Sequence, residues 1–190
     1  MRVLQSTSFE HISGALTVGT YLADWLTSVE GTVRTSTYIR YRGIVDNHLS
    51  PTLGAGKLSR LTPNAVRKMY KEKTDAGLSP RSVNYIHVTL HKALRAAVLD
   101  GLIPRNVCDA VKAPQNHRPE VTPFDQEQVR ALLTAATGER LGCLFVLAIH
   151  TGLRRGELLA LRWSDIALDT GKLSVQRSLA SDGKFNPPKR

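Results

Sequence analysis

Two dipeptides, Thr62-Pro63 and Ser79-Pro80, constrain the fold of this chain more than any other feature. A Ser or Thr side chain caps a helix, and proline suits the first helical position because its missing N–H would have no partner there. Each dipeptide therefore predicts the start of a helix. Gly77 and Gly101 predict the ends of these two helices, so a short turn must join them.

Two further helices are predicted before this pair. The segment 17–29 has apolar residues at helical spacing, and Thr17 is placed to cap its start. The segment 35–49 also has an apolar face, and we expect it to end before Pro51. Four helices joined by short turns predict a compact helical bundle over residues 17–111.

A proline-rich linker, residues 112–123, follows the bundle and predicts a domain boundary. We expect residues 1–16 to form a loose N-terminal segment and residues 124–190 to belong to a second domain. This domain opens with Asp125, which predicts a helix cap, and with Gln128 at the capping-box position.

The second domain mixes helix and strand patterns. The apolar run 141–149 predicts a helix, and the alternation over 172–179 predicts a strand. Residues 181–184 have turn chemistry and lead into another strand. We expect that strand to stop before its hairpin can close, which would leave an unpaired strand edge.

Composition favours a polyanionic partner, because the net charge is +10 and both halves of the chain contribute to it. A basic domain without a nucleic-acid role is the alternative. Cys108 and Cys143 have no CxxC spacing and lie in apolar surroundings, so we expect buried thiols in a reducing cytoplasm. The sequence shows no signal peptide, membrane-spanning run or metal-ligand cluster.

The stretch 149–166, IHTGLRRGELLALRWSDI, has the pattern of an anion-binding site. A Thr151-Gly152 stop separates two apolar runs, and Arg154 and Arg155 open the second one. Glu157 follows Arg154 by three residues. Arginine is the residue for bidentate capture of a phosphate or carboxylate, and helix N-termini favour anions.

This arginine box resembles the first catalytic box of the tyrosine recombinases, or phage integrases, which cut and rejoin DNA. The resemblance implies that Arg154 binds the scissile phosphate and that Glu157 supports the site. It implies no such role for Arg155, which we expect to be a solvated neighbour. The alternative for Arg154 is a surface arginine that pairs with Glu157 along the helix.

The resemblance extends through STYIRYRGIVDNHLSPTLG, LSPRSVNYIHVTLHKAL and GLIPRNV in the first domain. It implies a mainly α fold, with a four-helix SAM-like core-binding domain over residues 17–111. The truncated α+β start of a tyrosine recombinase catalytic domain would follow. The reaction of this family uses no metal and no cofactor.

The family's later boxes contain a His-x-x-Arg and a tyrosine nucleophile. In this chain the last tyrosine is Tyr85 and the last histidine is His150, which we expect to cap its helix or to lie at the edge of the core. We therefore expect the N-terminal half of a recombinase, inactive by itself. The family's general-acid lysine would be Lys189, next to last in the chain, with Lys184 as the weaker candidate.

The resemblance implies double-stranded DNA and other recombinase protomers as partners. Polar faces of the second and fourth helices would contact the DNA phosphates and confer strong salt dependence. The candidates for this contact are Arg34, Arg40, Arg42, Arg81, Asn84, His91 and Arg95.

Two rival functions stay open. The chain could be a non-catalytic DNA-binding regulator or competitor derived from a shortened integrase, or it could be a helical interaction module that binds no nucleic acid. DNA affinity that falls steeply with salt would eliminate the second rival.

Overall fold

The computed structural model describes residues 15–113, 120–180 and 182–188. The chain divides into two compact units, Met1–Arg118 and Pro119–Arg190, and the division falls within the predicted linker. In the described ranges, no helix combines the length and apolarity that a membrane crossing would need.

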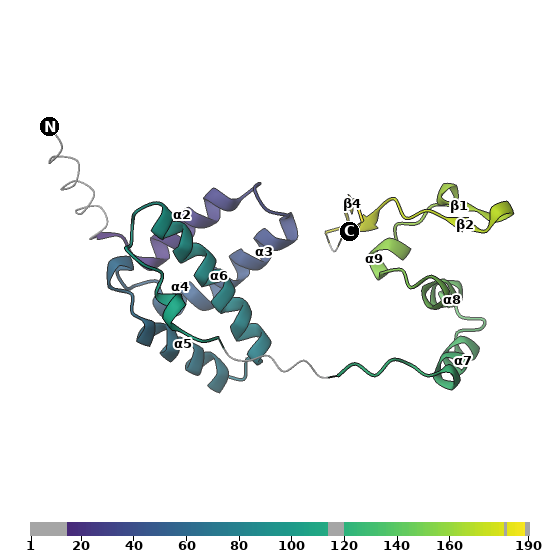
Figure 1. Cartoon of the computed structure of the whole chain (residues 1–190), viewed down its shortest axis with the longest axis horizontal. Coiled ribbons are helices and arrows are strands. Elements are labelled where there is room, and N and C mark those ends of the chain that lie inside the picture. Colours follow the sequence, from purple (N-terminus) through teal and green to yellow (C-terminus); the bar gives the residue numbers. More distant parts are fainter. Residues whose placement is uncertain (1–14, 114–119, 181, 189–190) are drawn as a thin grey trace. The chain divides into compact units, whose positions relative to one another are not determined.

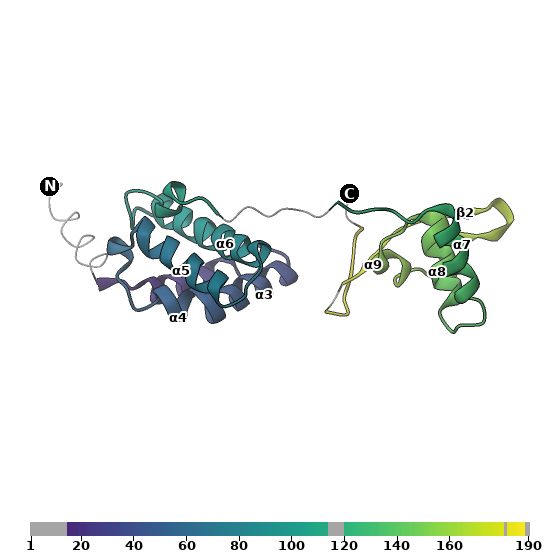
Figure 2. The ribbon, with the colours of Figure 1, turned by 90° about the horizontal axis from the view of Figure 1, so that it is seen from below.

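The first unit is helical (Figure 1). Its longest helix, α6, contacts α2, α3 and α5, and Figure 2 shows the same group of helices from below. The helices of this unit are α2 (Val18–Val29), α3 (Thr35–Ile44), α4 (Ser50–Leu53), α5 (Pro63–Asp75) and α6 (Pro80–Leu99).

Side-chain caps begin three of these helices, as predicted. The hydroxyl of Thr17 accepts a hydrogen bond from the N–H of Thr20 at 3.1 Å. Thr62 and Ser79 do the same for α5 and α6, each at 3.2 Å. These bonds satisfy donors that the first helical turn leaves without a partner.

The predicted end of the second helix before Pro51 is wrong. A π-helical turn, Val45–Leu49, follows α3 directly, and α4 continues through Pro51 to Leu53. In an α-helix the proline ring would clash with the carbonyl four residues earlier. The wider turn, in which the N–H of Ser50 donates to the Val45 carbonyl, accommodates the proline within one helical run.

One hydrophobic core fills the first unit. On α6, Val83, Ile86, Leu90, Ala93 and Ala97 lie at helical spacing and are all buried. Thr89 and Leu94 are buried with them. Cys108 is buried as expected.

The second unit has short elements. Its cap at Asp125 and the capping box with Gln128 are both present, as predicted. The described elements are α7 (Gln126–Ala135), α8 (Gly142–Thr151), α9 (Arg155–Leu158), β1 (Ile166–Ala167), β2 (Lys172–Leu173), β3 (Ser178–Leu179) and β4 (Phe185–Asn186).

The strand pairing differs from the sequence expectation. The expected strand 172–179 is two strands in separate sheets. A turn at Leu168–Thr170 and Gly171, with φ 63°, returns β2 onto β1, whereas β3 pairs with β4. The expected open edge is also wrong. β3 and β4 form a closed antiparallel hairpin in which Ser178 lies opposite Asn186.

The second unit buries little apolar surface among its described residues, where Ala136, Leu158 and Ala160 are the buried apolar side chains. On α8, Phe145 and other apolar residues are exposed. Cys143, which was expected to be buried, is exposed. Cys143 has apolar neighbours in the sequence but is not buried, because the described elements cover only part of α8.

Candidate active site and nucleic-acid interface

Arg154 lies between α8 and α9, two residues after the left-handed Gly152 that ends α8. Its Nη1 donates to Oε1 of Glu157 at 3.0 Å, and its backbone N–H donates to Oε2 at 3.0 Å. The Glu157 side chain is 7% exposed, whereas that of Arg154 is 67% exposed. A buried carboxylate thus anchors an exposed guanidinium.

The hydrogen bonds of this pair lower the pKa of Glu157. The backbone N–H of Arg154 contributes most to a lowered pKa of Glu157, and the hydrogen bond from the Arg154 side chain adds to it. The carboxylate therefore stays ionised at neutral pH. Glu157 also satisfies the N-terminal donor of α9, so one side chain both caps the helix and holds the arginine.

Gly156 lets α9 lie directly against β3. A Cβ at this position would lie 2.6 Å from the Leu179 carbonyl oxygen and 2.6 Å from the Ser178 Oγ. Only a residue without a side chain permits this approach. The first turn of α9, and with it Arg154, is thereby placed against the β3–β4 hairpin.

A second ion pair, which the sequence did not predict, joins the turn that precedes β1 to the residue that precedes β3. Arg177 Nη2 lies 2.7 Å from Oδ1 of Asp165, and both side chains are largely buried. The other oxygen of Asp165 accepts the N–H of Arg162 at 2.9 Å. Nη1 of Arg177 is buried without a hydrogen-bond partner in the described part of the chain. The sequence feature that could have indicated this pair is Asp165, an acidic residue in the largely apolar stretch that follows the arginine box.

In the first unit, two predicted DNA-binding residues come together. Arg40 of α3 and Arg81 of α6 both lie over the ring of Tyr85, at 5.2 and 5.8 Å from its centroid. Nη2 of Arg81 also donates to the Tyr85 hydroxyl at 3.3 Å. Both arginines are exposed.

Among the other predicted DNA-binding residues, two have internal partners. Arg42 forms an exposed ion pair with Asp46 at 3.6 Å. Nε2 of His91 lies 2.8 Å from Oδ1 of Asp109. Arg34 occupies the N-cap position of α3 without a side-chain capping bond, Arg95 is exposed on α6, and Asn84 is partly buried there.

Two positions near the chain terminus and one near the box complete the predicted set. Lys189 lies outside the described residues. The backbone N–H of Lys184 donates to the Asp182 side chain in the turn between β3 and β4. His150 is exposed, and its Nδ1 lies 2.8 Å from the carbonyl oxygen of Val146, within α8 itself.

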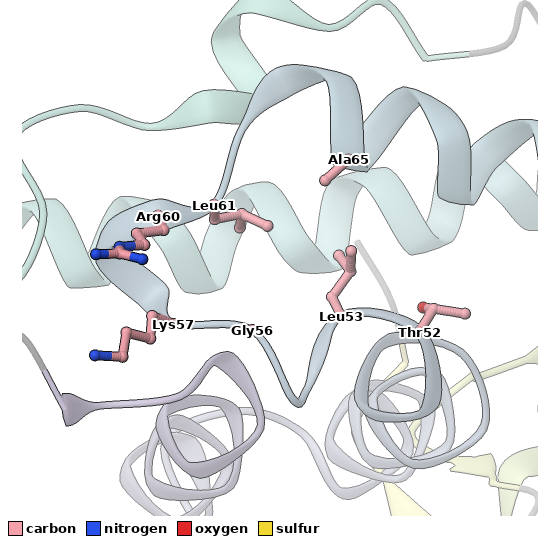
Figure 3. A pocket seen from close by; sticks show the side chains of 7 residues that line it. All are labelled: Thr52, Leu53, Gly56, Lys57, Arg60, Leu61 and Ala65. Carbon is pink, nitrogen blue, oxygen red and sulfur yellow. The ribbon is translucent and has the colours of Figure 1, made fainter.

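A pocket of about 440 Å³ lies between α4 and the start of α5. Leu53, Leu61 and Ala65 form its apolar lining, and Lys57 and Arg60 lie together at one side (Figure 3). The pocket contains none of the predicted site residues.

Comparisons with known proteins agree with this layout. Residues 17–74 match the phage integrase N-terminal SAM-like domain, and residues 123–186 match the phage integrase family. An integrase of Saccharopolyspora erythraea is 33% identical over 166 residues, which cover 86% of this chain and 38% of that protein. A XerC-like tyrosine recombinase of Caldanaerobacter subterraneus is 30% identical over 172 residues, covering 86% of this chain and 44% of the relative.

Solved structures share the fold. The Tn1549 transposon integrase in complex with a circular intermediate DNA has a TM-score of 0.80 at 20% identity, over 93% of this chain and 58% of that one. A lambda integrase dimer bound to a COC′ core site has a TM-score of 0.76 at 22% identity, over 98% of this chain and 53% of that one.

A SAM-like helical unit followed by an arginine box on a short helix defines an integrase-type chain. This chain belongs to the phage integrase family of tyrosine recombinases. It spans less than half the length of either curated relative.

Proposed function

We propose that this chain is the DNA-binding N-terminal part of a tyrosine-type site-specific recombinase that acts in DNA integration. One observation carries the proposal: the SAM-like and phage integrase matches follow one another in a single chain, with Arg154 in the second. The matched structures of Tn1549 integrase and lambda integrase, which are bound to DNA, support it.

In this proposal the first unit grips duplex DNA through the exposed cations of α3 and α6. Arg40, Arg81 and Arg95 are exposed, and the ion pairs of the described residues include none of them. Contacts of this kind neutralise phosphates and release counterions, which gives affinity with little sequence preference.

The second unit would supply Arg154 to the scissile phosphate. A guanidinium held by a buried carboxylate is preorganised, so it can stabilise the charge of a phosphoryl transition state without first being oriented. Lys189 stays the proposed general acid. Within these 190 residues no tyrosine follows Tyr85, so the polypeptide alone would bind DNA without forming a phosphotyrosyl bond.

The partners proposed for the chain are duplex DNA and further protomers. Lambda integrase, a structural relative, forms a dimer on a core site and a tetramer on a Holliday junction. A cytoplasmic location is part of the same proposal, because cytoplasmic DNA would be the substrate.

The proposal is tested by titrating the purified chain against a labelled duplex over a range of salt concentrations. We expect log affinity to fall linearly with log salt, with a slope of about −0.9 for each phosphate contacted. Replacing Lys68 with Ala on α5 is the control, because this cation lies outside the proposed face. Affinity that is absent, or independent of salt, would contradict the proposal.

A further inference from the structure

Tyr85 gathers two cations from different helices. Arg40 comes from α3 and Arg81 from α6, yet both guanidinium groups lie within 6 Å of one ring centroid. The ring is 37% exposed, so the cluster stands at the surface of the unit. The negative face of an aromatic ring attracts cations, and arginine stacks on it readily.

A ring restrains an arginine without neutralising it. Arg42 is held by the carboxylate of Asp46, which offsets its charge, and Nε2 of His91 lies 2.8 Å from Oδ1 of Asp109, which occupies that nitrogen. The ion pairs among the described residues include neither Arg40 nor Arg81. These two arginines therefore keep full charge for an external anion.

A second aromatic ring next to this cluster, that of Tyr41, is held by the core. The ring of Tyr41 is buried, lies 5.4 Å from that of Trp25 in the core, and is 6.0 Å from the Arg40 guanidinium. Lys92 of α6 lies 5.3 Å from the same ring and donates to its hydroxyl at 3.2 Å. Packing in the core thus fixes the ring of Tyr41, over which Arg40 and Lys92 lie.

We infer that Tyr85 is a positioning residue for DNA binding, which holds Arg40 and Arg81 as a preset pair for phosphodiester groups. This inference rests on the proposed function. An arginine that is already ordered loses less side-chain entropy on binding, at roughly 0.5–1.5 kcal/mol for each immobilised side chain. Tyr85 adds affinity through the arginines and makes no essential contact with the DNA.

The test compares Tyr85→Leu and Tyr85→Phe in the full chain, with Val88→Ala as a control at an exposed apolar position of the same helix. We expect Tyr85→Leu to weaken duplex binding by about five-fold or more, since two arginines lose their restraint. Tyr85→Phe keeps the ring and should retain most of the affinity. The salt slope should stay unchanged in both, because no charge is removed.

A double-mutant cycle separates positioning from direct contact or unfolding. In a chain that carries Arg40→Ala and Arg81→Ala, we expect Tyr85→Leu to have almost no further effect on the dissociation constant. Thermal unfolding of each variant checks that the bundle is intact. An equal loss in both backgrounds, or wild-type affinity of Tyr85→Leu alone, overturns the inference while the proposed function stands. If the unchanged chain has no DNA affinity, the proposed function fails and the inference fails with it.

Discussion

The carboxylate of Glu157 is buried while the guanidinium of Arg154, to which it is bonded at 3.0 Å, is exposed. The pair is therefore asymmetric: one partner belongs to the interior of the second unit, and the other is presented to solvent. A surface ion pair of two exposed side chains would be weak and poorly oriented. Because the Glu157 carboxylate is buried, it holds the exposed Arg154 guanidinium in a defined orientation.

Lowering the pH should protonate Glu157 and so break its ion pair with Arg154. Because the pKa of Glu157 is lowered in the folded chain, its contribution to stability is complete above the ordinary carboxyl pKa and is lost as pH falls through the lowered value. We expect the backbone amides of α9 to exchange faster over that range. Hydrogen exchange against pH checks this, and Glu157→Gln should flatten the dependence. A pH dependence that persists in Glu157→Gln would assign the effect to another carboxyl group.

Gly156→Ala should displace α9 from β3. The new methyl group meets the Leu179 carbonyl oxygen, which is backbone and cannot rotate away, so we expect a loss of roughly 1–3 kcal/mol in local stability. Gly43→Ala on α3 is the matched control. Its added Cβ would meet only the Asn47 side chain, at 4.0 Å, so alanine should stabilise that helix by up to about 1 kcal/mol. Denaturant unfolding of both variants measures the difference.

The 190-residue polypeptide should form no covalent bond with DNA. Its last tyrosine, Tyr85, lies in α6 of the first unit, and Arg154 alone can bind a phosphate but cannot attack it. A suicide substrate followed by a denaturing gel tests this, with a complete recombinase as the positive control. A protein–DNA adduct would require another nucleophile in this chain.

Replacing Arg81 and Arg95 together with Ala should weaken duplex binding and make its salt slope shallower by about 0.9 for each lost phosphate contact. Both residues are exposed on α6, so the fold should tolerate the change. Fluorescence anisotropy at several salt concentrations gives the slope. Unchanged affinity would remove α6 from the interface.

The second unit should be the less stable of the two. Its described residues bury few apolar side chains, whereas a continuous core fills the first unit. Opening free energies follow the apolar contacts that must be broken, so amides in residues 126–179 should exchange faster than those in residues 18–99. Equal protection in the two ranges would show that the second unit is as self-sufficient as the first.

Because the first unit has its own continuous core, a polypeptide of residues 17–111 should fold alone.

Features that depend on near neighbours in sequence were predictable. The caps at Thr17, Thr62 and Ser79, and the capping box of Asp125, each involve residues three positions apart, and all four are present. The buried residues of α6 recur at helical spacing, which is likewise a local property of the sequence.

Features that depend on distant residues were not predictable. The Asp165–Arg177 pair joins positions twelve residues apart across a chain reversal that the sequence analysis missed. The meeting of Arg40 and Arg81 at Tyr85 depends on how α3 and α6 pack. The sequence pattern predicted each of these arginines as a DNA-binding residue, but it could not show that both lie over the ring of Tyr85. The roles proposed for Arg154, Glu157 and Lys189 stay predictions.

The π-helical turn at Val45–Leu49 also sets the rotational phase of the helical run that begins with α3. Tyr41, Val45, Leu49 and Leu53 are buried and recur at every fourth residue. At 3.6 residues per turn, such a spacing would drift by about 40° around the axis with each step. The wider turn rotates less per residue and subtracts from this drift, so the four side chains keep facing one core. Deleting one residue there would rotate the buried side chains after it, including Leu53, relative to Arg40 on α3.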